Sequence, residues 1–440
     1  MHMKETRAKM AGFTTSLRNP TYLQSSFSML LFFASWGIWW SFFQIWLTSE
    51  TTGLALTGAQ VGTVYSVNSL ATLVLMFAYG AIQDRLGVKK HLAVVLAAVT
   101  ALVGPFVTWV YQPLLQSNFM TGVILGAIVL SIGFLAGVGL FEALTERYSR
   151  RFGFEYGQAR MWGSFGYAVV ALAAGFLFTI NPMLNFWIGS VLGLVHLALL
   201  LFSRAKGEPV PKRPVEGIMS PASTPSFREM LGLFRLPSLW LIIIFVMLSW
   251  TFYTVFDQQM FPEFYTGLFD DPATGQRVYG ILNSVQVFFE AAMLGIVPII
   301  MRRVGVRASL LMGVAIMFVR ILGCALVDDP LLVSAIKMLH AIETPMFILP
   351  VFRYFTLHFN PALSATLYMV GFQVSAQIGN VVLSTPLGAL HDRVGNEQTF
   401  ITIAIVVLLA GVYGFFALKK DDQQVDGDPF LRHSKTAVDA

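Results

Sequence analysis

Long apolar stretches repeat along almost the whole chain, and they limit the possible folds more than any other feature. We count twelve, each bounded to within a few residues: 22–49, 58–82, 91–111, 118–145, 157–180, 183–203, 238–266, 278–301, 306–327, 331–354, 362–390 and 398–418. Each spans about 20 or more predominantly apolar residues, the length that a helix needs to cross a membrane. The chain is only 12% charged, whereas a soluble domain is roughly one quarter charged. The sequence therefore predicts an all-α membrane protein with twelve transmembrane helices, and it excludes a β-barrel, whose segments are short and alternating.

The Lys and Arg residues indicate how these helices are oriented. With both termini in the cytoplasm, 24 of the 29 Lys and Arg residues fall in cytoplasmic segments and only Arg277 and Arg393 in outer loops. Such an excess on the inside is the rule for membrane proteins, so we expect cytoplasmic N- and C-termini. The net charge of +5 is then explained by topology, and no nucleic-acid partner is needed. Cys324 is the single cysteine, so the chain can form no internal disulfide.

The longest loop divides the apolar stretches into six and six. It covers 204–237, and its middle is rich in Pro, Gly and Ser, which is typical of a flexible linker. We predict six-helix bundles at 22–203 and 238–420, with cytoplasmic segments at 1–21 and 421–440. An even division of this kind is typical of transporters built from two pseudo-symmetric halves.

Ionisable side chains lie inside the predicted helices, where a charge is costly and usually marks the path of an ion or a solute. They are Glu142, Arg160, Asp257, Glu290, Arg320, Lys337, His340 and Glu343. The four carboxylates outnumber the three fixed cations, and a protonated acid is the least costly way to hold the surplus carboxylate in an apolar medium. This pattern predicts a protein that handles protons.

Counting about 1.5 Å per residue places several of these charges at similar depths on antiparallel helices. Asp257 and Lys337 form one natural pair, which we interpret as structural. Lys337, His340 and Glu343 are expected on one helix, and Arg320 can pair with Glu343 or His340. Because histidine titrates near neutrality, we interpret the last three as a proton-handling group. A purely structural salt-bridge network is the alternative.

Glu142 and Arg160 lie near the cytoplasmic ends of their stretches. Hydropathy alone favours interfacial anchoring and a functional role equally. Tyr167 follows Arg160 by seven residues on the same helical face, so an aromatic ring and a guanidinium can line one surface. Such a surface suits a sugar, which has an apolar ring face and a rim of hydroxyl groups.

Four of the nine tryptophans lie in the first apolar stretch. Three of them, Trp36, Trp39 and Trp40, are too deep for an interfacial belt. Packing against lipid or neighbouring helices is favoured over contact with a ligand.

Sequence motifs of enzymes and metal sites are absent. The chain has no His-Glu-x-x-His, no phosphate-binding Gly-rich loop and no Cys-x-x-Cys, and His340-x-x-Glu343 alone is too little for a metal site. We therefore expect no enzymatic activity, no metal and no cofactor, with the proton as the only coupling ion. Without an ATPase domain, uphill transport would depend on an ion gradient.

One loop carries a family motif. The second and third stretches are joined by Gly80-Ala-Ile-Gln-Asp84-Arg85-Leu-Gly87-Val-Lys89-Lys90. This run resembles the signature loop of the major facilitator superfamily.

Four further stretches resemble the oligosaccharide:proton symporters of that superfamily, the lactose permease-like family. They are residues 141–146, 154–163, 253–259 and 337–343, and the likeness extends from about Tyr22 to Lys420. The resemblance implies that Glu142 and Arg160 bind sugar. It also implies that Arg320, His340 and Glu343 form a proton-translocation group. Asp257 and Lys337 would then form a structural ion pair.

The chain departs from the lactose branch of the family at several positions. Tyr167 stands where that branch has a stacking tryptophan, and Thr254 and Ala376 replace its second Asp–Lys pair. Loss of both partners leaves no orphan charge. The glutamate of the eighth stretch is Glu290, one turn beyond the lactose-branch position, here Val287. These departures resemble the sucrose permeases and leave open whether Glu290 contacts sugar, proton or both.

The sequence thus predicts a proton-coupled symporter that imports a disaccharide across the cytoplasmic (inner) membrane of a bacterium. Sucrose is the favoured disaccharide. Its expected partners are the sugar, H⁺ and the lipid bilayer, and it is expected to act as a monomer. The alternatives are a lactose- or raffinose-type symporter and a non-transporting sensor. A sensor is disfavoured, because neither the linker nor the tail has room for a signalling domain.

Overall fold

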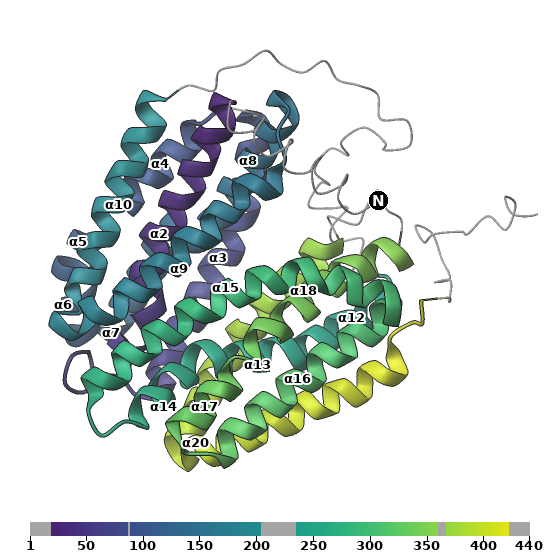
Figure 1. Ribbon diagram of the computed structural model, residues 1–440. Helices are drawn as coiled ribbons and strands as arrows, with labels where there is room; N and C mark the ends of the chain where they lie inside the picture. The colour runs from purple at the N-terminus through teal and green to yellow at the C-terminus, as the bar shows by residue number, and fades with distance from the viewer. Residues whose placement is uncertain (1–18, 87–88, 204–234, 360–366, 422–440) are drawn as a thin grey trace, which may run out of the picture. The chain divides into compact units, whose positions relative to one another are not determined.

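The computed structural model describes residues 19–86, 89–203, 235–359 and 367–421 (Figure 1). Within these ranges every regular element is a helix, as predicted. The predicted segments 1–21, 204–237 and 421–440 lie almost entirely outside the described residues, as do residues 87–88 of the signature loop. The cytoplasmic location of the termini stays a prediction.

The helices up to the linker follow one another with short connections, and turns with π-helical hydrogen bonding are marked η. They are α2 (Pro20–Thr48), α3 (Gly58–Leu86), α4 (His91–Thr100), α5 (Val103–Phe106), η1 (Val107–Tyr111), α6 (Gln112–Ser117), α7 (Phe119–Leu130), η2 (Ser131–Leu135), α8 (Gly137–Phe152), α9 (Tyr156–Ile180) and α10 (Met183–Phe202).

The helices beyond the linker contain further π turns. They are α12 (Pro237–Val246), η3 (Met247–Thr251), α13 (Phe252–Val255), η4 (Phe256–Met260), α14 (Phe261–Gly267), α15 (Pro272–Val304), α16 (Val306–Leu326), α17 (Pro330–Lys337), α18 (His340–His358), η6 (Met369–Val374) and α20 (Ser375–Ala417).

All twelve predicted stretches fall on these helices, as far as the described residues reach. In that part of the chain, ten helices are long and apolar enough to cross a membrane, or eleven if the bent pair His91–Thr100 and Val103–Ser117 counts as one. The last two predicted stretches lie in a single run, Met369–Ala417, whose backbone leaves helical geometry at Gly395 (φ 78°, ψ −176°). A count of twelve spans stays a prediction.

The chain divides into two compact units, which we describe separately. As far as they are described, the first comprises Met1–Leu56, Val67–Val215 and Phe269–Phe288, and the second comprises Thr57–Ser66, Glu216–Leu268 and Phe289–Ala440. The predicted bundles at 22–203 and 238–420 stay a prediction.

In the first unit, α2 packs along α9 and α10 (Figure 1). Glycines let these helices approach closely, as is usual for helix pairs in membranes. A Cβ on Gly166 of α9 would lie 2.6 Å from the backbone oxygen of Leu30, and one on Gly189 of α10 would lie 3.0 Å from that of Ser35. The backbones of these helices therefore nearly touch, which fixes α2 against α9.

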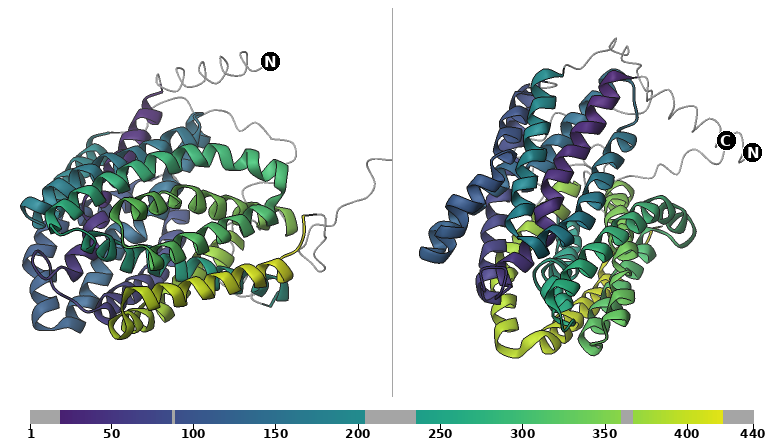
Figure 2. Two further views of the ribbon diagram at one scale, coloured as in Figure 1. Left: turned by 60° about the horizontal axis from the view of Figure 1, so that its bottom comes forward. Right: turned by 60° about the vertical axis from the view of Figure 1, so that its left-hand side comes forward.

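In the second unit, α16 packs against α18 and α20 (Figures 1 and 2). The run from α12 to α14 is interrupted by η3 and η4. Pro262, just after η4, has no N–H and cannot donate to the carbonyl of Gln258 four residues earlier. The hydroxyl group of Tyr65 donates to this carbonyl instead, at 3.3 Å. The irregular backbone is thus satisfied at this carbonyl, as a membrane-spanning helix requires.

Candidate functional site

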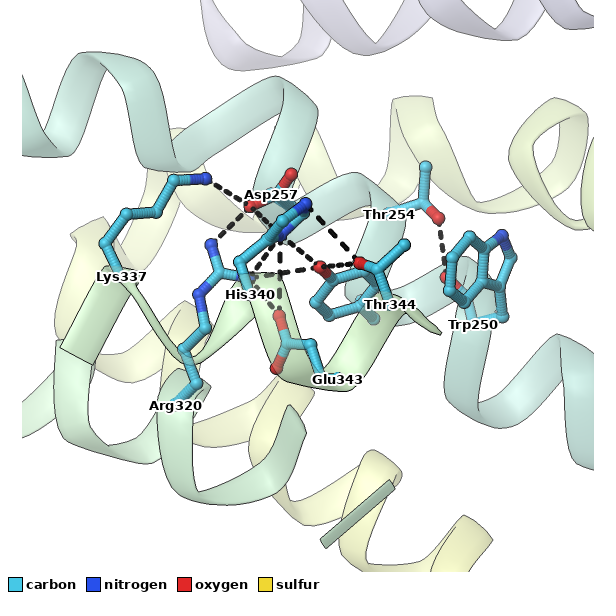
Figure 3. A network of polar contacts seen from close by, with 9 residues as sticks. Trp250, Thr254, Asp257, Arg320, Lys337, His340, Glu343 and Thr344 are labelled. Atoms are coloured by element: carbon cyan, nitrogen blue, oxygen red, sulfur yellow. Dashed lines mark hydrogen bonds and ion pairs between the residues drawn. The ribbon is translucent and has the colours of Figure 1, made fainter. Parts of the chain in front are cut away.

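Five ionisable residues of the second unit form one network (Figure 3). Asp257 lies in the π turn η4, Arg320 in α16, Lys337 at the end of α17, and His340 and Glu343 in the first turn of α18. The side chains of Arg320 and Glu343 are fully buried, and that of Asp257 is 13% exposed. The sequence predicts two separate groups here, whereas the structure brings all five side chains together.

Asp257 is the acceptor shared by three of these side chains (Figure 3). Its Oδ1 lies 2.9 Å from Lys337 Nζ and 3.3 Å from His340 Nδ1, and it also forms an ion pair with Arg320 Nη2. Asp257 and Lys337 are therefore in contact as expected, but as part of a larger cluster. The structural role of this pair stays a prediction.

Arg320 is shared between two carboxylates. Its Nη2 contacts Asp257, and its Nη1 lies 2.6 Å from Glu343 Oε1. If His340 is neutral, Asp257 and Glu343 balance Arg320 and Lys337, so the geometry is that of a charge-neutral cluster. Among the described residues, Glu343 Oε2 has no hydrogen-bond partner. Glu343 thus has one oxygen held by a cation and a second oxygen open to a proton.

Lys337 and His340 lie in one span, Pro330–His358, as expected from the sequence, but a local turn separates α17 from α18. Between them, Met338 and Leu339 form a tighter turn, in which the amide of Leu339 donates to Ile336 O and that of Ala341 to Met338 O. In such a 3₁₀ turn, side chains three residues apart lie directly in line. The turn therefore directs both Lys337 and His340 toward Asp257.

Two uncharged side chains complete the network, and the sequence interpretation assigned neither of them a role. The hydroxyl of Tyr253 contacts His340 Nδ1 and lies 3.2 Å from Arg320 Nη1. Thr344 Oγ1 lies 3.4 Å from both Tyr253 Oη and His340 Nε2. Spacing offered a signal, because Tyr253 precedes Asp257 and Thr344 follows His340 by four residues, about one helical turn.

The first unit holds a second ion pair. Arg160 Nε on α9 lies 2.6 Å from Glu142 Oε1 on α8, and these side chains are 29% and 32% exposed. Arg160 Nη1 also donates to Ser164 Oγ at 3.3 Å, and the guanidinium lies 4.2 Å from the ring centroid of Phe33. A partly exposed carboxylate beside a guanidinium offers acceptors and donors to a neutral polar solute.

Tyr167 lies on the same helix as Arg160 and is half-buried. Its ring covers Gly37, where a Cβ would lie 2.6 Å from Tyr167 Cδ2, and it meets the ring of Trp36 edge-on at 6.4 Å. Glu290 is half-buried on α15, in the part of that helix that belongs to the second unit. The role of Glu290 stays a prediction.

Comparison with solved structures shows the fold. The chain is similar to the nucleoside transporter NupG, with a TM-score of 0.74 and 17% identity over 91% of this chain and 99% of that one. A D-xylose–proton symporter matches with a TM-score of 0.62 and 14% identity over 92% of this chain and 99% of that one. Likeness at such low identity shows the fold alone, and the chain shares the fold of these membrane transporters.

The sequence comparison then shows the family. The model of the LacY proton/sugar symporter family matches residues 14–427, and the chain belongs to this family. Among its relatives are the sucrose permease of Escherichia coli, 43% identical over 93% of this chain and 96% of that protein, and the raffinose permease of the same organism, 36% identical over 86% and 88%. A lactose permease of Klebsiella oxytoca is 35% identical over 86% and 90%. The chain is thus a proton-coupled sugar symporter, a multi-pass protein of the bacterial inner membrane.

Proposed function

We propose that this symporter imports sucrose together with a proton, by alternating access. The observation that carries the choice of sugar is the 43% identity with a sucrose permease over 93% of the chain, against 35–36% for raffinose and lactose permeases. The positions at which the chain departs from the lactose branch, such as Tyr167 and Glu290, support the same choice. A lactose- or raffinose-type sugar is the second candidate.

In this proposal Glu142 and Arg160 hold the sugar. Their ion pair is one-third exposed, so its remaining lone pairs and N–H groups can bind sugar hydroxyls. Phe33 stacks on the guanidinium and limits its movement. Tyr167 supplies an aromatic face on the same helix, and Glu290 connects sugar binding with proton binding.

The proton binds Glu343 in this proposal. A proton on Oε2 would neutralise the carboxylate and weaken its pairing with Arg320. The released Nη1 has other acceptors close by, because Tyr253 Oη and His340 Nδ1 both lie 3.2 Å away. Protonation thus exchanges the Glu343 partner of the Arg320 guanidinium for Tyr253 or His340. The stability of the cluster therefore differs between the protonated and the deprotonated transporter.

We further propose that the protein needs neither a second subunit nor a cofactor. It acts as a monomer in the lipid bilayer, with no enzymatic activity, no nucleic-acid partner and no cofactor other than the coupled proton. An ion gradient drives accumulation, since the family couples sugar to protons.

Uptake by cells that express the protein tests the choice of sugar. Sucrose should alkalinise a weakly buffered medium, and labelled sucrose uptake should be inhibited more strongly by unlabelled sucrose than by lactose or raffinose. Alkalinisation by lactose or raffinose but not by sucrose would replace the first candidate by the second. Sugar uptake without proton movement would contradict the proposed coupling.

Glu343→Gln tests the assignment of the proton. The amide cannot bind and release a proton, so uphill accumulation of sucrose should be lost while counterflow exchange remains. Glu146→Gln, a change at a partly exposed carboxylate of the first unit, serves as the control and should leave both activities intact. Accumulation against a gradient by Glu343→Gln would show that the proton binds elsewhere.

A further inference from the structure

Two tryptophans form the only accessible strip on the C-terminal part of α2. Between Phe32 and Thr48 every residue is buried except Trp36 and Trp40, which are half-buried and one helical turn apart. Trp39, between them in sequence, is 0% exposed and stacks on Phe186. The expectation that these tryptophans serve only packing therefore fits Trp39 and leaves Trp36 and Trp40 unexplained.

The depth of these two rings argues against membrane anchoring. Trp40 lies 8 residues and Trp36 lies 12 residues before the end of α2 at Thr48, which corresponds to about 12 and 18 Å along the helix. They are farther still from its start at Pro20. Tryptophans that anchor a helix lie at the membrane surface instead.

The two rings continue the surface that holds Arg160. The guanidinium lies over Phe33, whose ring centroid is 6.0 Å from that of Trp36. Trp36 in turn lies 5.7 Å from Trp40 and 6.4 Å from Tyr167. A continuous aromatic wall thus leads away from the ion pair along α2 and α9, which pack side by side (Figure 1).

The chemistry of this wall changes along its length. At one end, Glu142 and Arg160 offer charge-assisted hydrogen bonds. At the other end the surface is apolar: the Nε1 atom of Trp36 is itself buried, so the exposed part of this ring consists of carbon atoms. From Phe33 to Trp40 the helix rises about 10 Å, which leaves room for two sugar rings in line rather than one.

We infer that Trp36 and Trp40 bind the second ring of the disaccharide, whose first ring is held by Glu142 and Arg160. The inference rests on the proposed function and adds the basis for selecting a disaccharide over a monosaccharide. The C–H face of the second ring packs on the indoles, while its hydroxyl rim remains free for other contacts. Loss of an indole should then weaken the binding of a disaccharide and leave that of a single ring unchanged.

The test compares Trp36→Leu and Trp40→Leu with Trp36→Phe in sucrose counterflow. Each Leu variant should raise the KM for sucrose at least about fivefold, with the maximal rate and the amount of folded protein retained. Trp36→Phe keeps an aromatic face and should stay within about twofold of wild type. Of the single rings methyl α-glucoside and fructose, the one that binds at Glu142 and Arg160 should inhibit all variants equally. Trp109→Leu, at a ring that is 67% exposed in the same unit, is the matched control and should leave the KM unchanged.

The outcomes separate this inference from the proposed function. If the wild type transports sucrose and both Leu variants keep its KM, the second ring does not bind here and only the inference fails. A purely structural or lipid-facing role would lower the amount of folded protein, or would weaken the single rings as much as sucrose. If the wild type transports no sucrose, the experiment is repeated with lactose and raffinose, and transport of none of them overturns the proposed function together with the inference.

Discussion

Asp257→Asn is the most direct test of the charge network. The substitution removes the carboxylate that Lys337 contacts at 2.9 Å and leaves Lys337 and Arg320 opposed by Glu343 alone within the cluster. Removal of one partner from a buried ion pair costs about 3–5 kcal/mol, because the other charge stays buried without compensation. Asp257 is 13% exposed and Lys337 3%, so solvent can relieve little of this cost. We expect the free energy of unfolding to fall by about 3–5 kcal/mol.

Lys337→Met should cost less, because Asp257 keeps its contacts with Arg320 and His340. We expect a loss of about 1–2 kcal/mol. In the double variant Asp257→Asn/Lys337→Met, the pair of Arg320 and Glu343 is balanced again. The second substitution should therefore stabilise the first, by about 2 kcal/mol. The decisive prediction is that Lys337→Met destabilises the wild type but stabilises the Asp257→Asn variant.

The free energy of unfolding of the purified protein can be measured for wild type, both single variants and the double variant, by circular dichroism in mixed detergent–SDS micelles. The ion pair of Glu146 and Arg150 is the control, because its side chains are 34% and 69% exposed. Its double-mutant cycle should give a coupling below about 0.5 kcal/mol. If Lys337→Met destabilises the Asp257→Asn variant as much as it destabilises wild type, the two side chains are not coupled and the reasoning is refuted.

Substitutions at the sugar site, in the charge network and between α2 and α9 should each have a distinct effect. Arg160→Lys loses the planar guanidinium that contacts Glu142 and Phe33. The KM for sucrose in counterflow should therefore rise about 10-fold or more. An unchanged KM would show that Arg160 does not bind the sugar. Tyr253→Phe removes the hydroxyl that lies 3.2 Å from Arg320, so proton-driven accumulation measured with labelled sucrose should fall several-fold while counterflow is retained. Gly166→Ala should lower the melting temperature, because the added Cβ would lie 2.6 Å from the backbone of α2. Gly139→Ala is the control and should leave the melting temperature unchanged, because a Cβ there would have no atom within 4 Å. Equal melting temperatures of the two variants would contradict the close approach of α2 and α9.

The positions of the helices could be predicted because a membrane imposes a length on each apolar stretch. The stretch at 157–180 corresponds to α9 (Tyr156–Ile180), and that at 183–203 to α10 (Met183–Phe202). Breaks within a stretch could not be predicted, because a change in the hydrogen-bond pattern leaves the hydropathy unchanged. The π turn of Ser131–Leu135 and the turn between Lys337 and His340 are of this kind.

The members of the charge network could be predicted because an ionisable group is rare inside a membrane helix and needs a reason. Their partners could be predicted only in part. Residue counting gives the depth of a side chain, but its direction around the helix axis shifts wherever a π or 3₁₀ turn intervenes. For this reason Asp257, in a π turn, meets Arg320 as well as Lys337. Tyr253 was missed because a tyrosine in an apolar helix carries no cost that would single it out.

The hydroxyl group of Tyr65 that satisfies the Gln258 carbonyl has a consequence for the evolution of this family. The bond is needed only because residue 262 is a proline, and any other residue at that position could donate its own amide. Positions 65 and 262, almost two hundred residues apart, should therefore vary together. Relatives without the proline should tolerate phenylalanine at position 65, and relatives that keep the proline should retain a hydroxyl donor there.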